Sequence, residues 1–238
     1  MEDSLIRSTL TQGLPALGLG EELIPQLTEF SRLLLEKNQV MNLTAITEPR
    51  EVATLHLLDS LSLAPREDLS GRRIIDVGTG AGFPGVPLAI ALPESEVTLL
   101  DSLGKRVDWL NEVCAQLGLE GIQAIHARAE EQALVKGYRD SFDFVTARAV
   151  ANLRLLGELC LPYVKVGGQF LAMKTTESAS EVEEAAHCIK LLGGRAEEPV
   201  DYTIPGTQVT HRVLPIRKLA PTLKGYPRRW ARIQKQPL

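Results

Sequence analysis

Cysteine is scarce in this chain of 238 residues, which contains only Cys114, Cys160 and Cys188. Their number is odd, they lie far apart in the sequence, and no two of them form a CxxC pair. This pattern argues against a disulfide framework and against a zinc site, so we expect no bound metal. Isolated thiols of this kind are typical of packed side chains in a reducing compartment, which favours a cytoplasmic protein.

The chain also lacks a long apolar run and a basic leader. Its longest apolar run, residues 86–92, is far shorter than the ~20 residues that span a membrane. The acidic start, residues 1–4, differs from the basic first region of a secretory signal. We therefore expect no membrane association. The length, with 44% hydrophobic residues, fits one large α/β domain with a small extension.

Acidic side chains are absent after Asp201, whereas residues 202–238 carry eight lysines and arginines. The whole chain has a net charge of −4, so the first 201 residues carry −12. Basic residues interleaved with Tyr226 and Trp230 are typical of a surface that contacts nucleic acid. A solvated tail with a basic bias explains the same composition, and the sequence alone leaves both interpretations open.

Helical periodicity occupies the start of the chain, and strands alternate with helices after it. Apolar residues recur on one face over residues 20–41, and Thr47 with Pro49 predicts the start of a second helix that ends near Pro65. The predicted strands lie at residues 73–77, 96–100, 122–127, 142–147, 169–174, 196–202 and 212–216. The predicted helices between them lie at residues 84–92, 104–117, 153–163 and 180–192.

This alternation predicts an α/β fold with a mostly parallel seven-stranded sheet and helices on both faces. The last two strands have no helix between them, which suggests a hairpin at the edge of the sheet. We expect three units along the chain. They are an N-terminal helical cap (1–70), a cofactor-binding domain (71–217) and a basic tail (218–238).

The most informative motif is a glycine-rich turn after the first strand, where residues 73–85 read RIIDVGTGAGFPG. Glycines at this spacing let bare backbone approach a nucleotide-like ligand, and Asp101, at the end of the next strand, suits ribose hydroxyls. Two cofactors fit the motif. The glycines at 80, 82 and 85 match a nicotinamide dinucleotide fingerprint. Residues 76–82 also match the first motif of Rossmann-like S-adenosylmethionine methyltransferases.

Three features favour methyl transfer over redox chemistry. Asp76 places an acid inside the first strand, where it would complement the sulfonium and ammonium groups of S-adenosylmethionine better than a pyrophosphate. Pro84 removes an amide donor that a pyrophosphate would use. Residues 161–171 contain a helix–Gly-Gly–strand turn that is common in methyltransferases after the fourth strand.

The chain resembles the GidB/RsmG methyltransferases, which methylate N7 of a guanosine in bacterial 16S rRNA. The resemblance rests on residues 42–46 (NLTAI), 77–85 (VGTGAGFPG) and 226–229 (YPRR), and Phe-Pro after the glycines is more specific than the glycines alone. It spans nearly the whole chain and implies a Rossmann-like class I methyltransferase. Further matching blocks are His56-x-x-Asp59-Ser60, Asp101-Ser102-x-x-Lys105-Arg106, Arg128-Ala129-Glu130, Arg148-Ala149 and Lys174. The tail departs from the family at Ala231 and Ile233, where glycine and proline are usual.

The resemblance implies S-adenosyl-L-methionine as the cofactor and assigns the residues that hold it. Asp101 is expected to bind the ribose hydroxyls, and Ala129 with Glu130 is expected to hold the adenine. The residues expected to bind the cofactor are Gly78, Gly80, Gly82, Phe83, Asp101, Ser102, Ala129, Glu130 and Arg148. The candidate catalytic residues, in positioning roles, are Arg148, Lys174 and His56.

The expected reaction is an in-line transfer of methyl from sulfur to nitrogen. Guanine N7 has a lone pair and no proton to lose, so we expect no indispensable general acid or base. Acids near the base, such as Asp59 or Glu130, would stabilise the cationic product. The expected partner is 16S rRNA or the small ribosomal subunit, contacted by a monomer. If the tail contacts RNA, its removal should weaken RNA binding without changing cofactor affinity.

Two other functions remain open on the residues alone. An NAD-dependent oxidoreductase would use the dinucleotide fingerprint and bind NADH. A non-catalytic cofactor-binding or RNA-binding module would bind the cofactor without transferring a methyl group. Both use the same glycine turn, so the identity of the cofactor and the transfer of label separate them from a methyltransferase.

Overall fold

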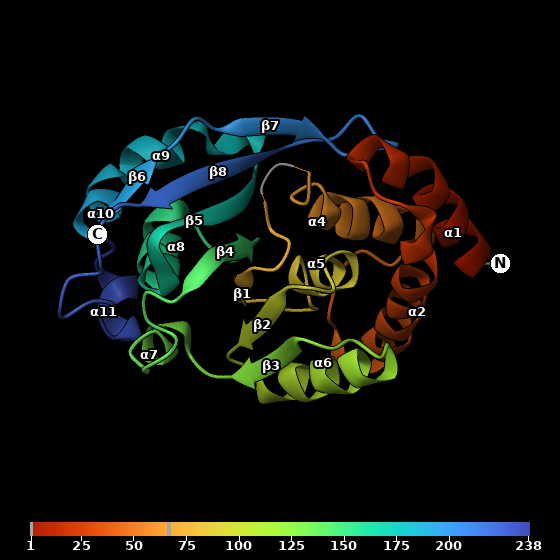
Figure 1. Ribbon diagram of the computed structural model, residues 1–238, viewed down its shortest axis with the longest axis horizontal. Helices are drawn as coiled ribbons and strands as arrows, with labels where there is room; N and C mark the ends of the chain where they lie inside the picture. The colour runs from red at the N-terminus through yellow and green to blue at the C-terminus, as the bar shows by residue number, and fades with distance from the viewer. Residues whose placement is uncertain (1, 66–67) are drawn as a thin grey trace.

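The computed structural model describes residues 2–65 and 68–238, and within these ranges eight strands form one sheet. Seven strands lie side by side in the order β3-β2-β1-β4-β5-β8-β6, and β7 pairs with the other end of β8 (Figure 1). Strands β1 to β5 are parallel, and β8 runs antiparallel to its neighbours. The strands are β1 (Arg73–Val77), β2 (Glu96–Asp101), β3 (Ile122–His126), β4 (Phe142–Arg148), β5 (Val164–Thr175), β6 (Gly194–Ala196), β7 (Val200–Thr203) and β8 (Thr210–Lys218).

The expected count of seven strands is wrong, because the predicted strand at residues 196–202 is two strands. Pro199 lies in the break between β6 and β7 and has no amide proton to donate to the ladder. The Glu197 carboxylate, in the same break, accepts hydrogen bonds from Arg217 and Gln169. The predicted hairpin is present, because β7 and β8 pair antiparallel across the turn at residues 204–209, and β6 adds a second short strand to the same edge of β8.

Helices cover both faces of the sheet, as the alternating pattern predicts. The N-terminal helices lie on the same face as α5 and α6, whereas the helices from α7 onward lie on the other face (Figure 1). The helices are α1 (Glu2–Gly13), α2 (Ile24–Met41), α3 (Pro49–Glu51), α4 (Asp59–Leu61), α5 (Gly85–Ala91), α6 (Gly104–Gln116), α7 (Ala129–Gln132), α8 (Leu153–Cys160), α9 (Glu181–Glu184), α10 (Ala186–Leu191) and α11 (Trp230–Lys235). Short 3-10 turns lie at Leu14–Leu17, Glu21–Leu23, Leu161–Tyr163 and Thr176–Ser180. Among the described residues, no helix is long and apolar enough to cross a membrane.

A π-helical segment, Val52–Leu58, joins α3 and α4 into one continuous helix. Glu48 rather than Thr47 caps its start, because the Glu48 carboxylate accepts a hydrogen bond from the Glu51 amide at 2.8 Å. The wider π turn leaves main-chain carbonyls free of the regular α-helical pattern and is often found at functional sites. This segment carries His56 and leads directly into Asp59.

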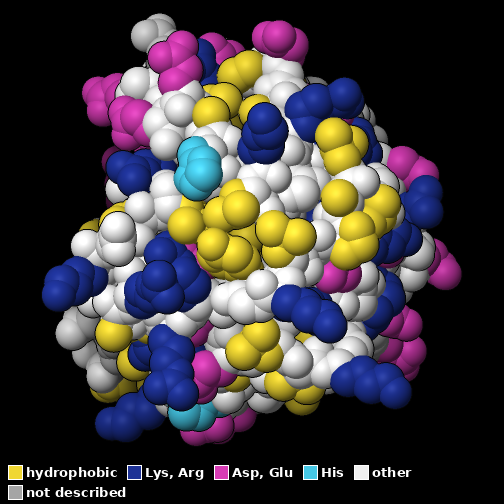
Figure 2. Space-filling model, turned by 90° about the vertical axis from the view of Figure 1, so that its left-hand side faces the viewer, with side chains coloured by type: hydrophobic (Ala, Val, Ile, Leu, Met, Phe, Trp, Pro, Cys, Tyr) yellow, Lys and Arg dark blue, Asp and Glu magenta, His cyan; other side chains and the backbone are white. Residues whose placement is uncertain are grey.

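The C-terminal segment is fixed to the α8 face of the sheet by buried polar contacts. The Glu158 carboxylate, fully buried on α8, accepts hydrogen bonds from the Arg228 amide and guanidinium at 2.6–2.8 Å. Lys218 is also fully buried and donates to Thr222 and to the Leu161 carbonyl, both at 2.6 Å. Figure 2 shows this side of the molecule, where lysine and arginine side chains surround a central group of hydrophobic side chains.

Candidate active site

The candidate functional site lies at the carboxyl ends of β1, β2 and β4. The chain continues from β1 to β2 on one side and later to β4 on the other, so the strand order reverses between β1 and β4. Ligands of open α/β sheets bind at such a switch point. Two adjoining pockets open there and share Gly78, Asp101, Ser102 and Val150 in their lining. We call them the Glu130 pocket and the Thr44 pocket, after one residue in each.

The glycine turn has the open backbone that the sequence predicts. Gly78, Gly80 and Gly82 have φ values of +73°, +59° and +93°, a region that residues with a Cβ rarely adopt. A Cβ on Gly78 would also lie 2.9 Å from Val150. The Asp101 carboxylate closes the turn, since it accepts hydrogen bonds from the amides of Gly80 and Leu103, both at 2.9 Å. The turn therefore offers bare main chain beside a carboxylate at the rim of both pockets.

Asp76 supports the glycine turn from beneath and does not face the ligand. Its carboxylate is fully buried and accepts hydrogen bonds from Thr79 at 2.7 Å, the Gly85 amide at 3.0 Å and Thr146 at 3.1 Å. Burial raises the pKa of Asp76 to about 6, although these hydrogen bonds oppose the rise. The expectation that this acid complements the positive charges of a cofactor is wrong, because every oxygen is used inside the fold.

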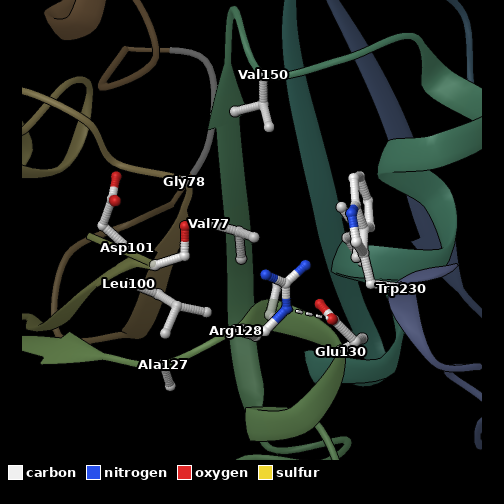
Figure 3. Close-up of a pocket in the computed structure, with 12 residues that line it drawn as sticks. Val77, Gly78, Leu100, Asp101, Ala127, Arg128, Glu130, Val150 and Trp230 are labelled. Carbon is white, nitrogen blue, oxygen red and sulfur yellow. Dashed lines mark hydrogen bonds and ion pairs between the residues drawn. The ribbon is translucent and has the colours of Figure 1, made fainter. Parts of the chain in front are cut away.

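The Glu130 pocket combines apolar walls with two buried acids, Asp101 and Glu130, as Figure 3 shows. The Glu130 carboxylate accepts a 2.7 Å hydrogen bond from Arg128 Nε, and the Arg128 guanidinium lies 5.6 Å from the centre of the Trp230 ring. Ala129, at the start of α7, lines the same pocket. Leu100, Val77, Ala127, Val150 and Leu159 supply the apolar lining. A flat, partly polar ring such as adenine suits these surroundings.

Trp230 connects the C-terminal segment to this pocket. In Figure 3 its indole stands across the pocket from the strand ends, on the same side as Glu130. The composition of the tail suggests nucleic-acid contact or a solvated basic tail, and no spacing in the sequence relates Trp230 to the glycine turn. The contact depends on the Arg228–Glu158 ion pair, at 2.6 Å, which fixes the chain two residues earlier.

Arg148, the last residue of β4, holds the sheet and the N-terminal helices together. One guanidinium nitrogen donates to the Asp59 carboxylate at 2.9 Å and to the Leu55 carbonyl at 3.0 Å. The other donates to His56 Nδ1 at 3.0 Å. The guanidinium also lies 5.0 Å from the centre of the Phe83 ring. One side chain thus fixes the glycine turn and the π-helical segment relative to each other.

His56 is a neutral imidazole with both nitrogens engaged. Its ring stacks on Phe83 with centroids 4.4 Å apart and an interplanar angle of 17°. Burial, followed by the nearby Arg148 charge, lowers the pKa of His56 to about 3. Nε2 lies 2.8 Å from the Thr44 hydroxyl. A ring that carries no charge and has no free nitrogen positions its neighbours and does not accept a proton from a substrate.

A third pocket lies on the other side of Arg148, and we call it the His211 pocket. Arg148, His56 and Ala149 line both this pocket and the Thr44 pocket, so they form the wall between them. Ala149 has a φ of +54°, an uncommon conformation for a residue with a Cβ. Ile46, Leu55, Met173 and Val209 supply apolar surface, and Lys174, Glu181 and His211 supply polar groups.

The polar groups of the His211 pocket form two sets of hydrogen bonds and ion pairs, one around Asp59 and one between Lys174 and Glu181. Asp59 is buried and holds His211 Nδ1 and the Tyr202 hydroxyl on one oxygen, both at 2.8 Å. Burial opposes ionisation of Asp59, but the hydrogen bond and charge of His211 and the charge of Arg148 bring its pKa below the usual value. Lys174 Nζ donates to the Ala151 carbonyl and pairs with Glu181 at 2.8 Å.

The structure thus places the predicted site residues on three adjoining pockets, with the exception of Gly82. Gly78, Gly80, Phe83 and Arg148 line the Thr44 pocket, whereas Lys174 lines only the His211 pocket. Gly82 lies behind the turn, where a Cβ would meet Val86 at 2.7 Å, so it serves packing. His211 and Tyr202 are missing from the sequence prediction, because His211 lies 152 residues from Asp59 and shares no motif with it. Within the described residues, no group of His, Cys, Asp and Glu side chains is arranged to hold a metal ion.

The residues at the switch point fit S-adenosylmethionine. Asp101 lies at the rim shared by the two pockets, where a ribose would span them. The Glu130 pocket suits the adenine, and the Thr44 pocket, beside the glycine turn, suits the amino-acid end. Asp101, Glu130 and the main chain at Gly78 and Gly80 would hold the cofactor. These are the same positions that the sequence resemblance assigns to it.

Comparison with known proteins identifies relatives along most of the chain. The model of a family described as GidB, rRNA small subunit methyltransferase G, matches residues 23–204. Two relatives carry the name ribosomal RNA small subunit methyltransferase G. The protein from Lachnoclostridium phytofermentans is 47% identical over 234 residues, which is 97% of each chain. The protein from Alkaliphilus oremlandii is 47% identical over 216 residues, which is 90% of each chain.

Solved structures show the same fold at lower identity. The structure described as MtNAS in complex with MTA and tNA has a TM-score of 0.55 at 16% identity, covering 80% of this chain and 71% of that chain. A SAM dependent methyltransferase from Aquifex aeolicus has a TM-score of 0.51 at 19% identity, covering 68% and 91%. The predicted Rossmann-like class I methyltransferase fold is therefore confirmed.

The surroundings of His56 predict a particular dependence of stability on pH. The pKa of His56 falls from 6.5 in the unfolded chain to about 3 in the folded chain. Below pH 6.5 the unfolded chain therefore binds a proton at His56, whereas the folded chain keeps this ring neutral down to about pH 3. The neutral His56 ring therefore contributes fully to the free energy of unfolding above pH 6.5. As the pH falls below 6.5, the free energy of unfolding decreases by about 1.4 kcal/mol per pH unit. Urea unfolding at pH 7.5, 6 and 5 should show a shallower loss for His56→Gln than for the native chain. The exposed His187→Gln variant serves as the control and should follow the native chain, whereas parallel curves for all three would contradict the assignment.

The position of Trp230 predicts that the C-terminal segment contributes to cofactor binding. Trp230→Ala removes one wall of the Glu130 pocket and should weaken S-adenosylmethionine binding by about tenfold, equivalent to ~1.4 kcal/mol. Isothermal titration calorimetry measures this loss. The neighbouring Arg229→Ala change, at an exposed side chain, should leave the affinity within about twofold. Equal affinities for Trp230→Ala and the native chain would contradict a role of the C-terminal segment in cofactor binding and would leave it RNA contact only.

Proposed function

Because this chain belongs to the GidB family, rRNA small subunit methyltransferase G, we propose that it methylates N7 of a guanosine in 16S rRNA. S-adenosylmethionine-dependent methylation of small-subunit rRNA follows from the family and the fold. The choice of guanine N7 is the finer step, and it rests on the sequence resemblance and on the chemistry of the site. The oxidoreductase alternative loses its support, since the family and the fold both belong to methyl transfer.

The observation that carries the proposal is the shortage of an available general base at the wall between the pockets. Both nitrogens of His56 are engaged, and the Lys174 ammonium is paired with Glu181. The Asp59 carboxylate already accepts from Arg148, His211 and Tyr202. An acceptor such as an amine or hydroxyl loses a proton during methylation, whereas guanine N7 loses none. The side chains of His56, Lys174 and Asp59 are thus occupied by partners within the protein, which suits a nucleophile that needs alignment only.

The His211 pocket is the proposed place for the target base. When bound, S-adenosylmethionine supplies a methyl group that is already activated by its sulfonium. Ile46, Leu55 and Met173 offer apolar surface to the faces of an unstacked purine. For an in-line transfer its N7 must reach the methyl group past Arg148 and Ala149, where the His211 pocket adjoins the Thr44 pocket. Methylation at N7 leaves a cationic ring, and the nearby Glu181 carboxylate offsets that charge.

Exposed basic side chains near the pockets are proposed to contact the phosphate backbone. Arg229, Arg232 and Lys235 flank Trp230 on the surface, and Arg128 is half exposed beside the Glu130 pocket. Phosphate contacts fix the orientation of an RNA without reading its bases, and they weaken with salt. We propose that the protein acts as a monomer in the cytoplasm, on 16S rRNA or on the small ribosomal subunit.

The test is transfer of labelled methyl to defined RNA. We expect the purified protein to label 16S rRNA or small subunits from cells that lack this enzyme, and the label to appear as 7-methylguanosine on nucleoside analysis. The Asp101→Ala variant, which loses the proposed ribose contact, should transfer at least tenfold less label at low cofactor concentration. Label in another nucleoside would contradict the N7 assignment, and cofactor binding without any label would support a non-catalytic module.

A further inference from the structure

The hydroxyl of Thr44 occupies a distinctive place at the edge of the Thr44 pocket. Its oxygen lies 3.0 Å from the Ile46 amide and 2.8 Å from His56 Nε2. The side chain is half-buried and lines the pocket together with Gly78, Gly80 and Phe83. These two contacts fix the position of the Thr44 oxygen, and the role of the hydroxyl then depends on the direction in which its proton points.

That direction follows from Arg148. A guanidinium is always protonated and only donates, so His56 Nδ1, at 3.0 Å from it, accepts. A neutral imidazole that accepts at Nδ1 carries its proton at Nε2, and Nε2 therefore donates to Thr44. The Ile46 amide also donates to Thr44. Because both acceptor positions of the Thr44 oxygen are filled, its own proton points outward as a donor.

The outward proton meets no acceptor among the described residues, and the pocket that it faces is rich in donors. Arg106 and Arg148 line this pocket, and the glycine turn borders it. The one acid in its lining, Asp101, already accepts from the Gly80 and Leu103 amides and pairs with Arg106 at 3.8 Å. A cluster of donors and cations of this kind recognises an anionic group.

We propose that the Thr44 hydroxyl donates a hydrogen bond to the carboxylate of S-adenosylmethionine, and that Arg148 and His56 fix this donor by relay. The inference rests on the proposed function, since it requires that cofactor. The sulfonium and the ammonium are both cationic and take no donor, and the ribose and adenine belong at Asp101 and Glu130. The carboxylate is the part of the cofactor that matches an O–H donor in the Thr44 pocket. Thr44 is thus a cofactor-binding residue, and His56 is a positioning residue that acts through it.

The test compares two ligands that differ only in the carboxylate. Calorimetry measures the affinity of S-adenosylmethionine and of its decarboxylated analogue for the native chain, Thr44→Val and Thr44→Ser. We expect Thr44→Val to weaken S-adenosylmethionine binding by about tenfold and to leave the analogue within about twofold, because only the first ligand accepts the bond. Thr44→Ser keeps the hydroxyl and should restore the affinity for S-adenosylmethionine.

The two ligands also separate the possible failures. Equal losses for both ligands in Thr44→Val, with a lowered melting temperature, would mean that Thr44 only supports the fold, and this would overturn the inference. Unchanged binding of S-adenosylmethionine in Thr44→Val would overturn it as well. A native chain that binds neither ligand would instead defeat the proposed function.

Discussion

The contacts of the Arg148 guanidinium determine how the rest of the site is arranged. Three partners on the π-helical segment and α4 converge on this one group at the end of β4, which lies 89–93 residues further along the chain. Such a buried, charge-assisted network stabilises a fold only when every member has its partners, and here the carboxylate of Asp59 and the ring of His56 are both satisfied. Its consequence is functional as well as structural, because the same side chains form the wall between the cofactor side and the proposed base side.

The N-terminal segment therefore lines the candidate active site as well as covering the sheet. His56 and Thr44 reach the cofactor side from this part of the chain, and Ile46 and Leu55 face the other side. The C-terminal segment enters from the opposite face through Trp230. A class I methyltransferase core thus receives one wall of each pocket from a segment outside its βαβ units. Under the proposed function, the two ends of the chain would supply substrate and cofactor contacts that the shared fold does not.

Much of this arrangement follows from sequence, because parallel strands and a glycine turn have strong local signals. The strands β1 to β5 and the roles of Gly78, Gly80 and Asp101 depend on patterns within about 30 residues. Asp76 shows the limit of such reasoning, since an acid inside a strand can serve the turn beneath it as well as the ligand above it. His211 and Tyr202 show a second limit. They meet Asp59 only through the pairing of β7 and β8, and no local pattern predicts a contact made by tertiary packing.

The most direct test of this account is the protonation of His56, measured by ¹⁵N NMR of the histidine side chains and assigned with the spectrum of His56→Gln. We predict that Nε2 carries the proton and that Nδ1 is a bare acceptor, unchanged from pH 8 to pH 5. A proton on Nδ1, or a ring that becomes doubly protonated near pH 6.5, would contradict it. Either result would mean that Arg148 does not hold the imidazole, and the wall between the pockets would need another explanation.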